Sequence, residues 1–275
     1  MMKTISAQLF RSNFAKFVII FFTGLTLWWI TIWFRGLTSG IENNAFTLIY
    51  PFLSLIGGAS GLIAAKKWGG FGSLLGRSIS FFSIGLLAQF FGQASYAYYI
   101  YLAGVEVPYP SIGDLGYFGS IGFYILGIIY LAKVAGVKVS LKSFSNKLIS
   151  LVIPLGMLVI SYWFFLRDYE FDWSAPLRIF LDFGYPLGQA IYISIAILAF
   201  ILSRNVLGGI MRGSILFMIS ALIIQYISDY TFLYQAYHET WYVGGINDFM
   251  YATSYFVMTL SLINIGQMFN KIKES

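Results

Sequence analysis

The sequence predicts an all-α integral membrane protein with about eight transmembrane helices. Composition, the spacing of apolar segments and the placement of charged residues lead to this fold class. Of the 275 residues, 59% are hydrophobic and only 10% are charged, whereas a soluble domain usually carries about 25% charged residues. Because so few charges cannot cover a water-exposed globule, we expect the lipid bilayer to surround the chain.

Apolar segments recur along the chain, each near the roughly 20 residues that a 30 Å hydrocarbon core requires. The first, 17–34, follows basic residues as a signal peptide would. It is long, however, and no small-residue cleavage site follows Phe34, so we expect it to be retained as a span. The second span, 45–65, contains Pro51, where we expect a kink. The third, 78–101, ends in tyrosines typical of a membrane interface.

The remaining spans have their own start and stop signals. The fourth, 112–133, follows Ser111 and has Asp114 near its start, and the fifth, 146–166, ends before Arg167. The sixth, 176–203, contains Pro186, which predicts a second kink. The seventh, 209–235, contains the acidic Asp229, and the eighth is 245–270.

Basic residues fix the expected orientation, because cytoplasmic connections of membrane proteins are rich in lysine and arginine. With the N-terminus inside, five basic residues fall in the two tails and nine in inner connections, making fourteen of seventeen. Those in the tails are Lys3, Arg11, Lys16, Lys271 and Lys273, and those in the connections are Lys66, Lys67, Arg77, Lys133, Lys138, Lys142, Lys147, Arg204 and Arg212. The sequence therefore predicts a multi-pass protein of the cell membrane with both termini in the cytoplasm.

The two halves of the chain resemble each other at an offset of about 135 residues. Tyr50-Pro51 matches Tyr185-Pro186, Gln89 and Gln93 match Gln225 and Asp229, and Asp114 matches Asp248. We therefore expect two four-helix repeats, 1–138 and 139–275. An even number of spans in each makes the repeats parallel, related by an axis along the membrane normal.

Three stretches carry a resemblance to a known class of membrane region: Tyr109 to Asp114, Asp182 to Gly188, and Asp229 to Asp248. They resemble segments of the multi-pass sensory regions that precede diguanylate cyclase (GGDEF) or histidine kinase domains in bacterial signalling proteins. The resemblance covers about residues 85 to 265 and implies a sensory role. Because the sequence ends a few residues after the eighth span, we expect no synthesis of a second messenger by this chain.

Missing residue types exclude several kinds of site. The chain has no cysteine, which removes disulfides, thiolate metal sites, iron–sulfur clusters and cysteine nucleophiles. Its only histidine is His238, so a bis-histidine haem is excluded. No zinc-protease motif or nucleophile elbow occurs, so we expect no enzyme. The basic residues are explained by membrane orientation, so we expect no nucleic-acid partner. No particular cofactor is indicated.

Polar residues within the spans are the candidate site. Asp229 lies one helical turn from Gln225, and a carboxylate in hydrocarbon is costly unless it is paired, hydrated or protonated. The equivalent face of the third span carries Gln89 and Gln93. These groups either line a shared ligand cavity or join helices through hydrogen bonds.

The sixth span has a polar stripe at helical spacing, formed by Arg178, Asp182, Tyr185 and Gln189. We interpret Asp182, Tyr185 and Gln189 as ligand-binding candidates, although Arg178 and Asp182 also have the spacing of a simple ion pair. Asp114 and Asp248 have two interpretations. They are caps at helix starts, with Asn247 as the N-cap of the eighth helix, or they form an outer cation site.

These residues favour a membrane-embedded sensor or ligand-binding module with an outward-opening polar pocket between the repeats. The ligand class would be a hydrophobic or cationic small molecule, and a cytoplasmic or membrane protein would read the bound state. A secondary transporter and an accessory subunit of a larger membrane complex are the alternatives. Glycines at close-packing spacing (Gly57/Gly61, Gly72/Gly76, Gly184/Gly188, Gly209/Gly213 and Gly113 to Gly122) are interpreted as helix contacts.

Overall fold

The computed structural model describes residues 12–136, 143–203 and 211–274, and in these ranges the chain is helical and contains no strand. Eight helical segments of the described chain are long and apolar enough to cross a membrane, as predicted. Some features that the sequence analysis used lie outside the described residues. They are the proposed boundary between the halves, Gly209, and the basic residues Lys3, Arg11, Lys138, Lys142 and Arg204.

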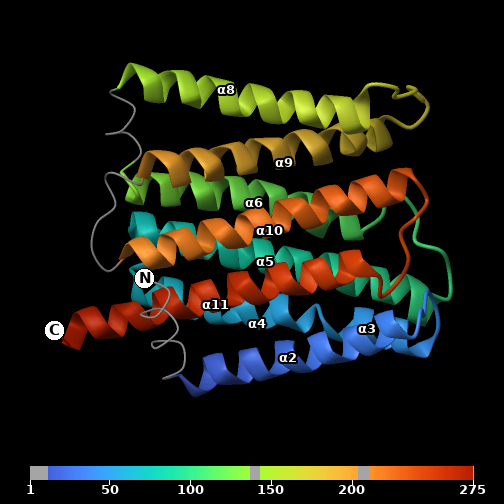
Figure 1. Cartoon of the computed structure of the whole chain (residues 1–275), viewed down its shortest axis with the longest axis horizontal. Helices are drawn as coiled ribbons and strands as arrows, with labels where there is room; N and C mark the ends of the chain where they lie inside the picture. The colour runs from blue at the N-terminus through green and yellow to red at the C-terminus, as the bar shows by residue number, and fades with distance from the viewer. Residues whose placement is uncertain (1–11, 137–142, 204–210, 275) are drawn as a thin grey trace.

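The helices run alongside one another (Figure 1). In chain order they are α2 (Asn13–Phe34), α3 (Ile41–Ile49), α4 (Phe52–Lys67), α5 (Leu74–Ala97), α6 (Gly113–Val134), α8 (Phe144–Ser161), α9 (Pro176–Ser203), α10 (Met211–Tyr237) and α11 (Ile246–Glu274). A short 3₁₀ turn, Gly70–Gly72, precedes α5. Helical turns of π type, Tyr98–Ala103 and Tyr162–Leu166, extend α5 and α8.

The second span is broken where its proline predicts. It consists of α3 and α4, which are separated by Tyr50 and Pro51, because proline lacks the N–H that would continue the helix. Pro186 has a different outcome, since α9 continues through it. The carbonyl oxygen of Pro186 accepts hydrogen bonds from Ser161 Oγ at 3.2 Å and Tyr230 Oη at 3.3 Å, which join α8, α9 and α10.

Acidic and basic residues gather at opposite ends of the bundle. One end, which we call the acidic end, carries the connections 35–40, 104–112, 167–175 and 238–245 and lies on the right of Figure 1. Its acids include Glu106, Asp168, Glu170, Asp172 and Glu239. The start of α2 and the end of α11 lie at the other end, the basic end, together with Lys16, Lys66, Lys67, Arg77, Lys133 and Lys147.

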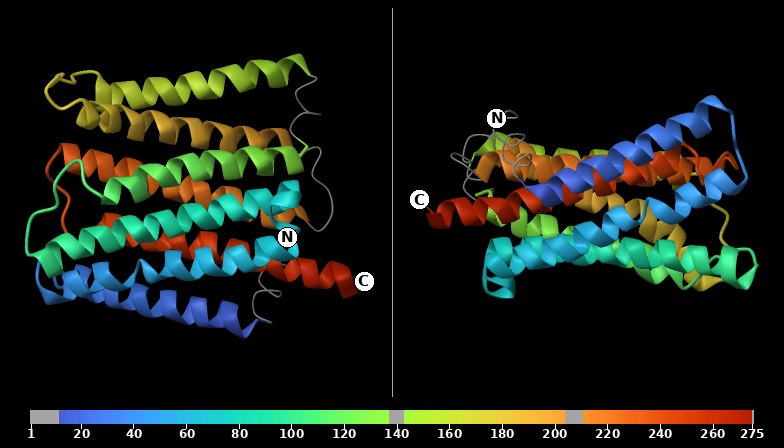
Figure 2. Two further views of the ribbon diagram at one scale, coloured as in Figure 1. Left: turned by 180° about the vertical axis from the view of Figure 1, so that it is seen from behind. Right: turned by 90° about the horizontal axis from the view of Figure 1, so that it is seen from below.

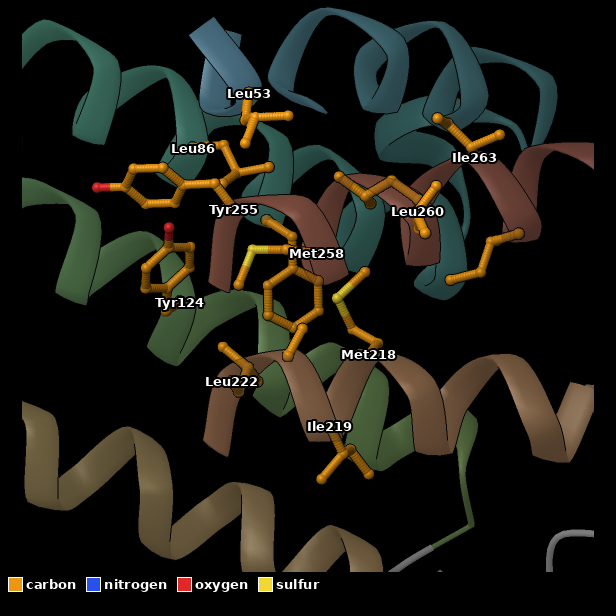
Figure 3. Close-up of a cluster of buried hydrophobic side chains, with 14 of the residues drawn as sticks. Leu53, Leu86, Tyr124, Met218, Ile219, Leu222, Tyr255, Met258, Leu260 and Ile263 are labelled. Carbon is orange, nitrogen blue, oxygen red and sulfur yellow. The ribbon is translucent and has the colours of Figure 1, made fainter. Parts of the chain in front are cut away.

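The view from below shows α5 and α6 on one side of the bundle and α2, α10 and α11 on the other (Figure 2). Between these helices lies a cluster of buried apolar side chains (Figure 3). Leu86 on α5, Leu222 on α10 and Met258 on α11 are fully buried in it. Because lipid is as apolar as these side chains, close packing rather than water exclusion stabilises the contact.

Glycines allow the closest helix approaches, but not at every predicted position. A Cβ on Gly57 would clash with Thr259 Oγ1 of α11, and one on Gly61 would clash with Ser83 Oγ of α5. The predicted contacts are therefore confirmed in α4. They are wrong for Gly119 and Gly122 of α6, where an added Cβ meets nothing within 4 Å. Residue spacing alone does not tell which glycines of a helix face a neighbour.

Candidate ligand-binding cavity

A cavity of about 1170 Å³ opens at the acidic end of the bundle. Its walls come from α3, α5, α6, α9, α10 and α11 and from the connections after α5, α8 and α10. The volume is slightly larger than the roughly 300–1,000 Å³ typical of small-molecule sites. Helices of both halves of the chain therefore enclose one space.

The sequence-predicted residues meet in this cavity. Six of the seven ligand-binding candidates line it, and so do both residues of the predicted outer acidic pair. These residues are Gln89, Gln93, Asp182, Tyr185, Gln189, Asp229, Asp114 and Asp248. Gln225 does not line the cavity, because it lies one turn deeper on α10 and is fully buried beneath Asp229.

Asp229 lies at the centre of a hydrogen-bond network that joins three helices. Its Oδ1 accepts from Gln225 Nε2 at 2.9 Å and from Tyr251 Oη at 3.1 Å. Its Oδ2 accepts from Tyr192 Oη of α9 at 2.9 Å. Ser254 Oγ of α11 donates to Gln225 Oε1 at 2.7 Å. The network joins helices and lines the cavity, so these two interpretations of Asp229 are compatible.

Asp248 also receives hydrogen bonds from neutral groups. Its Oδ2 accepts from Thr47 Oγ1 of α3 at 3.0 Å and from the Gly244 N–H at 2.6 Å, and its Oδ1 accepts from Tyr50 Oη at 3.3 Å. It lies in the first turn of α11, as predicted. The prediction that Asn247 caps this helix is wrong, because α11 already begins at Ile246 and Asn247 Nδ2 donates to the Ser228 carbonyl of α10 at 2.8 Å.

Asp114 bonds to the residue before its own helix and also contacts the other half of the chain. Its Oδ2 accepts from the Ser111 N–H at 2.7 Å, as one half of the predicted capping box would, but α6 begins at Gly113 with Ile112, not Ser111, at its N-cap. Its Oδ1 accepts from Tyr185 Oη of α9 at 2.6 Å. Tyr185 and Asp114 occupy the positions that the predicted repeat equates with Tyr50 and Asp248.

Asp182 is bound by two tyrosines and one arginine near the cavity mouth. Tyr109 Oη donates to Oδ1 at 2.7 Å and Tyr169 Oη to Oδ2 at 2.8 Å, while Arg178 Nε lies 3.7 Å from Oδ2. Desolvation and the hydrogen bond to Asp182 raise the pKa of Tyr169 to about 12. The same two causes raise the pKa of Tyr109 further. Both hydroxyls therefore stay protonated and donate to Asp182 at neutral pH.

The cavity is strongly acidic although the whole chain carries a formal net charge of +6. Arg178 is the one basic residue among its described lining residues, against eight acidic ones. The acids are Asp114, Asp168, Glu170, Asp172, Asp182, Asp229, Glu239 and Asp248. Of these, only Asp168 and Asp182 form an ion pair within the part of the chain that the structure describes.

Some buried polar atoms in the cavity wall have no hydrogen-bond partner among the described residues. They are Gln189 Oε1, Asn247 Oδ1 and Trp241 Nε1. Gln189 is only 4% exposed and Asn247 only 1%. Since buried polar groups in proteins are nearly always satisfied, these three atoms are exceptions, and their residues line the cavity.

Several lining residues were not predicted from the sequence. Tyr109 and Tyr169 hold Asp182, and Tyr251 holds Asp229. Tyr109 belongs to a stretch that resembles the sensory regions, and this resemblance is the sequence signal that could have identified it as a cavity residue. Among the described residues no group of three or more histidine, cysteine or acidic side chains is arranged to hold a metal ion, and His238 is exposed.

Comparison of the chain with protein-family models, with curated proteins and with solved structures gives no match. The resemblance to bacterial sensory regions therefore stays an expectation.

Proposed function

We propose that this membrane protein is a sensor or ligand-binding module, and that the acidic cavity is its ligand site. The observation that carries the proposal is the meeting of Gln93, Asp182, Gln189 and Asp229 in one large cavity. Intramembrane polar residues are expensive, and they generally mark functional sites when they face a cavity.

The hydrogen bonds around the cavity support its position between two repeats. Tyr50 of the first half donates to Asp248 of the second, and Tyr185 of the second half donates to Asp114 of the first. A second pair of contacts also follows the offset. Gln89 Nε2 donates to Ser120 Oγ at 2.7 Å, and Ser254 Oγ donates to Gln225 Oε1 at 2.7 Å. Exchanged and repeated contacts of this kind are what two parallel repeats, 1–138 and 139–275, would produce.

The placement of charge supports an outward-facing site. The basic end carries most of the described lysines, and lysine-rich ends of membrane proteins face the cytoplasm. The cavity then opens to the exterior of the cell membrane, and both termini are cytoplasmic. Ligand binding against Asp114 or Asp248 would compete with the Tyr185 and Tyr50 hydroxyls. This competition would shift one half against the other, and a cytoplasmic partner would read the shift.

A transporter is the alternative, and the interior favours binding over passage. Polar groups also occur in the inner halves of the spans, since Asn264 Nδ2 donates to Ser214 Oγ at 2.7 Å near the basic end and both residues are buried. Fully buried apolar residues nevertheless separate that pair from the cavity: Leu222 lies between Ser214 and Asp229 along α10, and Met258 lies between Asn264 and Tyr251 along α11. An accessory-subunit role draws support from exposed apolar faces such as that of α8, whose outer side exposes Leu151 and Leu155.

The test uses the purified protein in lipid nanodiscs and an extract of small molecules from its native cells. The extract is expected to raise the thermal unfolding midpoint, because a ligand that binds only the folded state stabilises it. Gln93→Trp, which places a bulky ring in the cavity, should reduce this rise, whereas Phe71→Trp at the basic end should keep it. No rise with the unaltered protein would contradict the proposal. Rapid exchange of extract components across proteoliposomes would instead favour transport.

A further inference from the structure

We propose that the cavity binds an arylalkylamine in its ammonium form, that is, an ammonium group on an alkyl chain that carries an aromatic ring, with the N–H donors pointing toward the buried floor. The inference rests on the proposed ligand-binding function and specifies the chemical class of the ligand. It depends on three independent features of the cavity: unbalanced acidic charge, buried acceptors without donors, and aromatic walls.

Charge selects a cation. Asp229 is 6% exposed and Asp248 is 3% exposed. Both accept hydrogen bonds from neutral groups only, and neither has an ion-pair partner among the described residues. A buried carboxylate is costly unless it is paired with a cation, hydrated or protonated, and hydrogen bonds from neutral groups offset only part of this cost. A positively charged ligand would remove this cost, whereas an anion would increase it.

The unpartnered atoms select a cation that donates hydrogen bonds. Asn247 is oriented by the bond from its Nδ2 to the Ser228 carbonyl, so Oδ1 is the acceptor that remains free. Gln189 Oε1 is the second free acceptor, on α9 and one turn from Tyr192. Both atoms belong to side chains more than nine-tenths buried that line the cavity with Asp229. An ammonium group supplies N–H donors to amide oxygens, and a quaternary ammonium does not.

Aromatic side chains on several sides favour a ring on the ligand. Tyr96 of α5, Tyr117 of α6, Phe232 of α10 and Tyr251 of α11 all line the cavity. Aromatic faces attract cations and pack edge-to-face or offset against other rings. Trp241 contacts both Tyr96 and Phe232 edge-on, and its buried Nε1 has no acceptor among the described residues. A hydroxyl or ether oxygen on the ligand would accept from it.

An inorganic cation does not fit these features. The volume of about 1170 Å³ far exceeds that of a single ion. Ions such as Ca²⁺ take six to eight oxygen ligands at about 2.3–2.6 Å. The described residues include no group of three acidic or histidine side chains that could hold a metal.

The experiment compares three probes with one skeleton: phenethylamine, its trimethylammonium derivative and phenylpropionate. Binding to the protein in nanodiscs is measured by isothermal titration calorimetry at neutral pH and low salt. Phenethylamine is expected to bind on the order of tenfold tighter than the trimethylammonium probe, because hydrogen bonds to charged groups contribute this much. Phenylpropionate is expected not to bind.

Variants test whether the cavity is the site. Asp229→Asn and Gln189→Leu should each weaken phenethylamine binding by at least about tenfold. Gln267→Leu is the matched control, because its buried amide also lacks a partner among the described residues but it lies near the basic end of α11. It should leave the affinity unchanged. Thermal unfolding of each variant in the nanodisc establishes that it is folded.

Equal or tighter binding of the trimethylammonium probe or of phenylpropionate would overturn the inference, and so would an affinity insensitive to Gln189→Leu and Asp229→Asn. Absence of phenethylamine binding would overturn it as well. If the cell extract still raises the unfolding midpoint in that case, the ligand class is wrong and the ligand-binding function stands. If neither the extract nor phenethylamine has an effect, both proposals fail.

Discussion

The hydroxyl of Tyr185 lies 2.6 Å from Oδ1 of Asp114 and donates a hydrogen bond to it, so the sixth span is joined to the start of the fourth. Tyr50 donates to Asp248 in the same manner, and both Tyr50 and Tyr185 directly precede a proline. The two bonds bridge the halves of the chain at the cavity and are the contacts that ligand binding would disturb.

Removal of the Tyr185 hydroxyl should therefore weaken the link between the halves. Tyr185→Phe leaves one hydrogen bond to Asp114 unmade, and we expect the free energy of unfolding to fall by about 1–3 kcal/mol. The measurement is equilibrium unfolding in mixed micelles. Tyr98→Phe, at a residue that is 56% exposed, is the control and should change stability little. Equal stability of Tyr185→Phe and the control would show that the hydrogen bond from Tyr185 to Asp114 does not stabilise the folded protein.

The network around Asp229 predicts a difference between two substitutions. Asp229→Leu leaves the donors on Gln225, Tyr192 and Tyr251 without their acceptor, and we expect a loss of about 3 kcal/mol or more in stability. Asp229→Asn keeps one acceptor and has nearly the same shape, so its loss should be smaller. The same unfolding assay compares them, and an Asp229→Leu protein as stable as Asp229→Asn would rule out the network as a stabilising feature.

Glycine packing gives a matched pair of variants. Gly57→Ala places a Cβ against Thr259 and Leu86, whereas Gly119→Ala places one in open space. Overpacking of this kind costs about 1–3 kcal/mol, so Gly57→Ala should lower stability by that amount. Gly119→Ala should stay within about 0.5 kcal/mol of the unaltered protein. A tolerated Gly57→Ala would contradict the close contact of α4 with α11.

The raised pKa of Tyr169 predicts a stability change at alkaline pH. The pKa rises from 10.0 to about 12 on folding because of desolvation and the hydrogen bond to Asp182. The folded state therefore holds this proton more tightly. The stabilisation is fully present below the unfolded pKa and is lost as pH rises toward the folded pKa. The difference in stability between the unaltered protein and Tyr169→Phe should shrink between about pH 10 and pH 12, and a constant difference would argue against the Asp182 contact.

The sequence predicted the spans and singled out eight of the polar residues that line the cavity, because polar side chains in apolar helices are rare and therefore informative. It could not predict which helix each polar group would meet. The spacing of Gln225 and Asp229 places both on one face of a helix, but only the packed bundle shows that Gln225 lies below the cavity while Asp229 lines it. Asn247 was mistaken for a cap because the start of a helix is uncertain by a residue or more from sequence.

Tyrosines were harder still to assign. Those near the ends of spans are typical of the membrane interface, and Tyr98 is exposed as that interpretation predicts. Tyr96, two residues earlier, lines the cavity instead. Tyr192 lies deeper and donates to Asp229 from another helix. No pattern within one helix distinguishes these three environments, because each depends on a neighbour distant in the sequence.

The most direct test of a ligand cavity open to the exterior uses the absence of cysteine from the native chain. Gln93→Cys introduces a single thiol in the cavity wall, and Phe71→Cys introduces one at the basic end. A membrane-impermeant maleimide added to intact cells is expected to modify Gln93→Cys at once and Phe71→Cys only after the membrane is permeabilised. Modification of Phe71→Cys on intact cells, with Gln93→Cys protected until permeabilisation, would contradict the account.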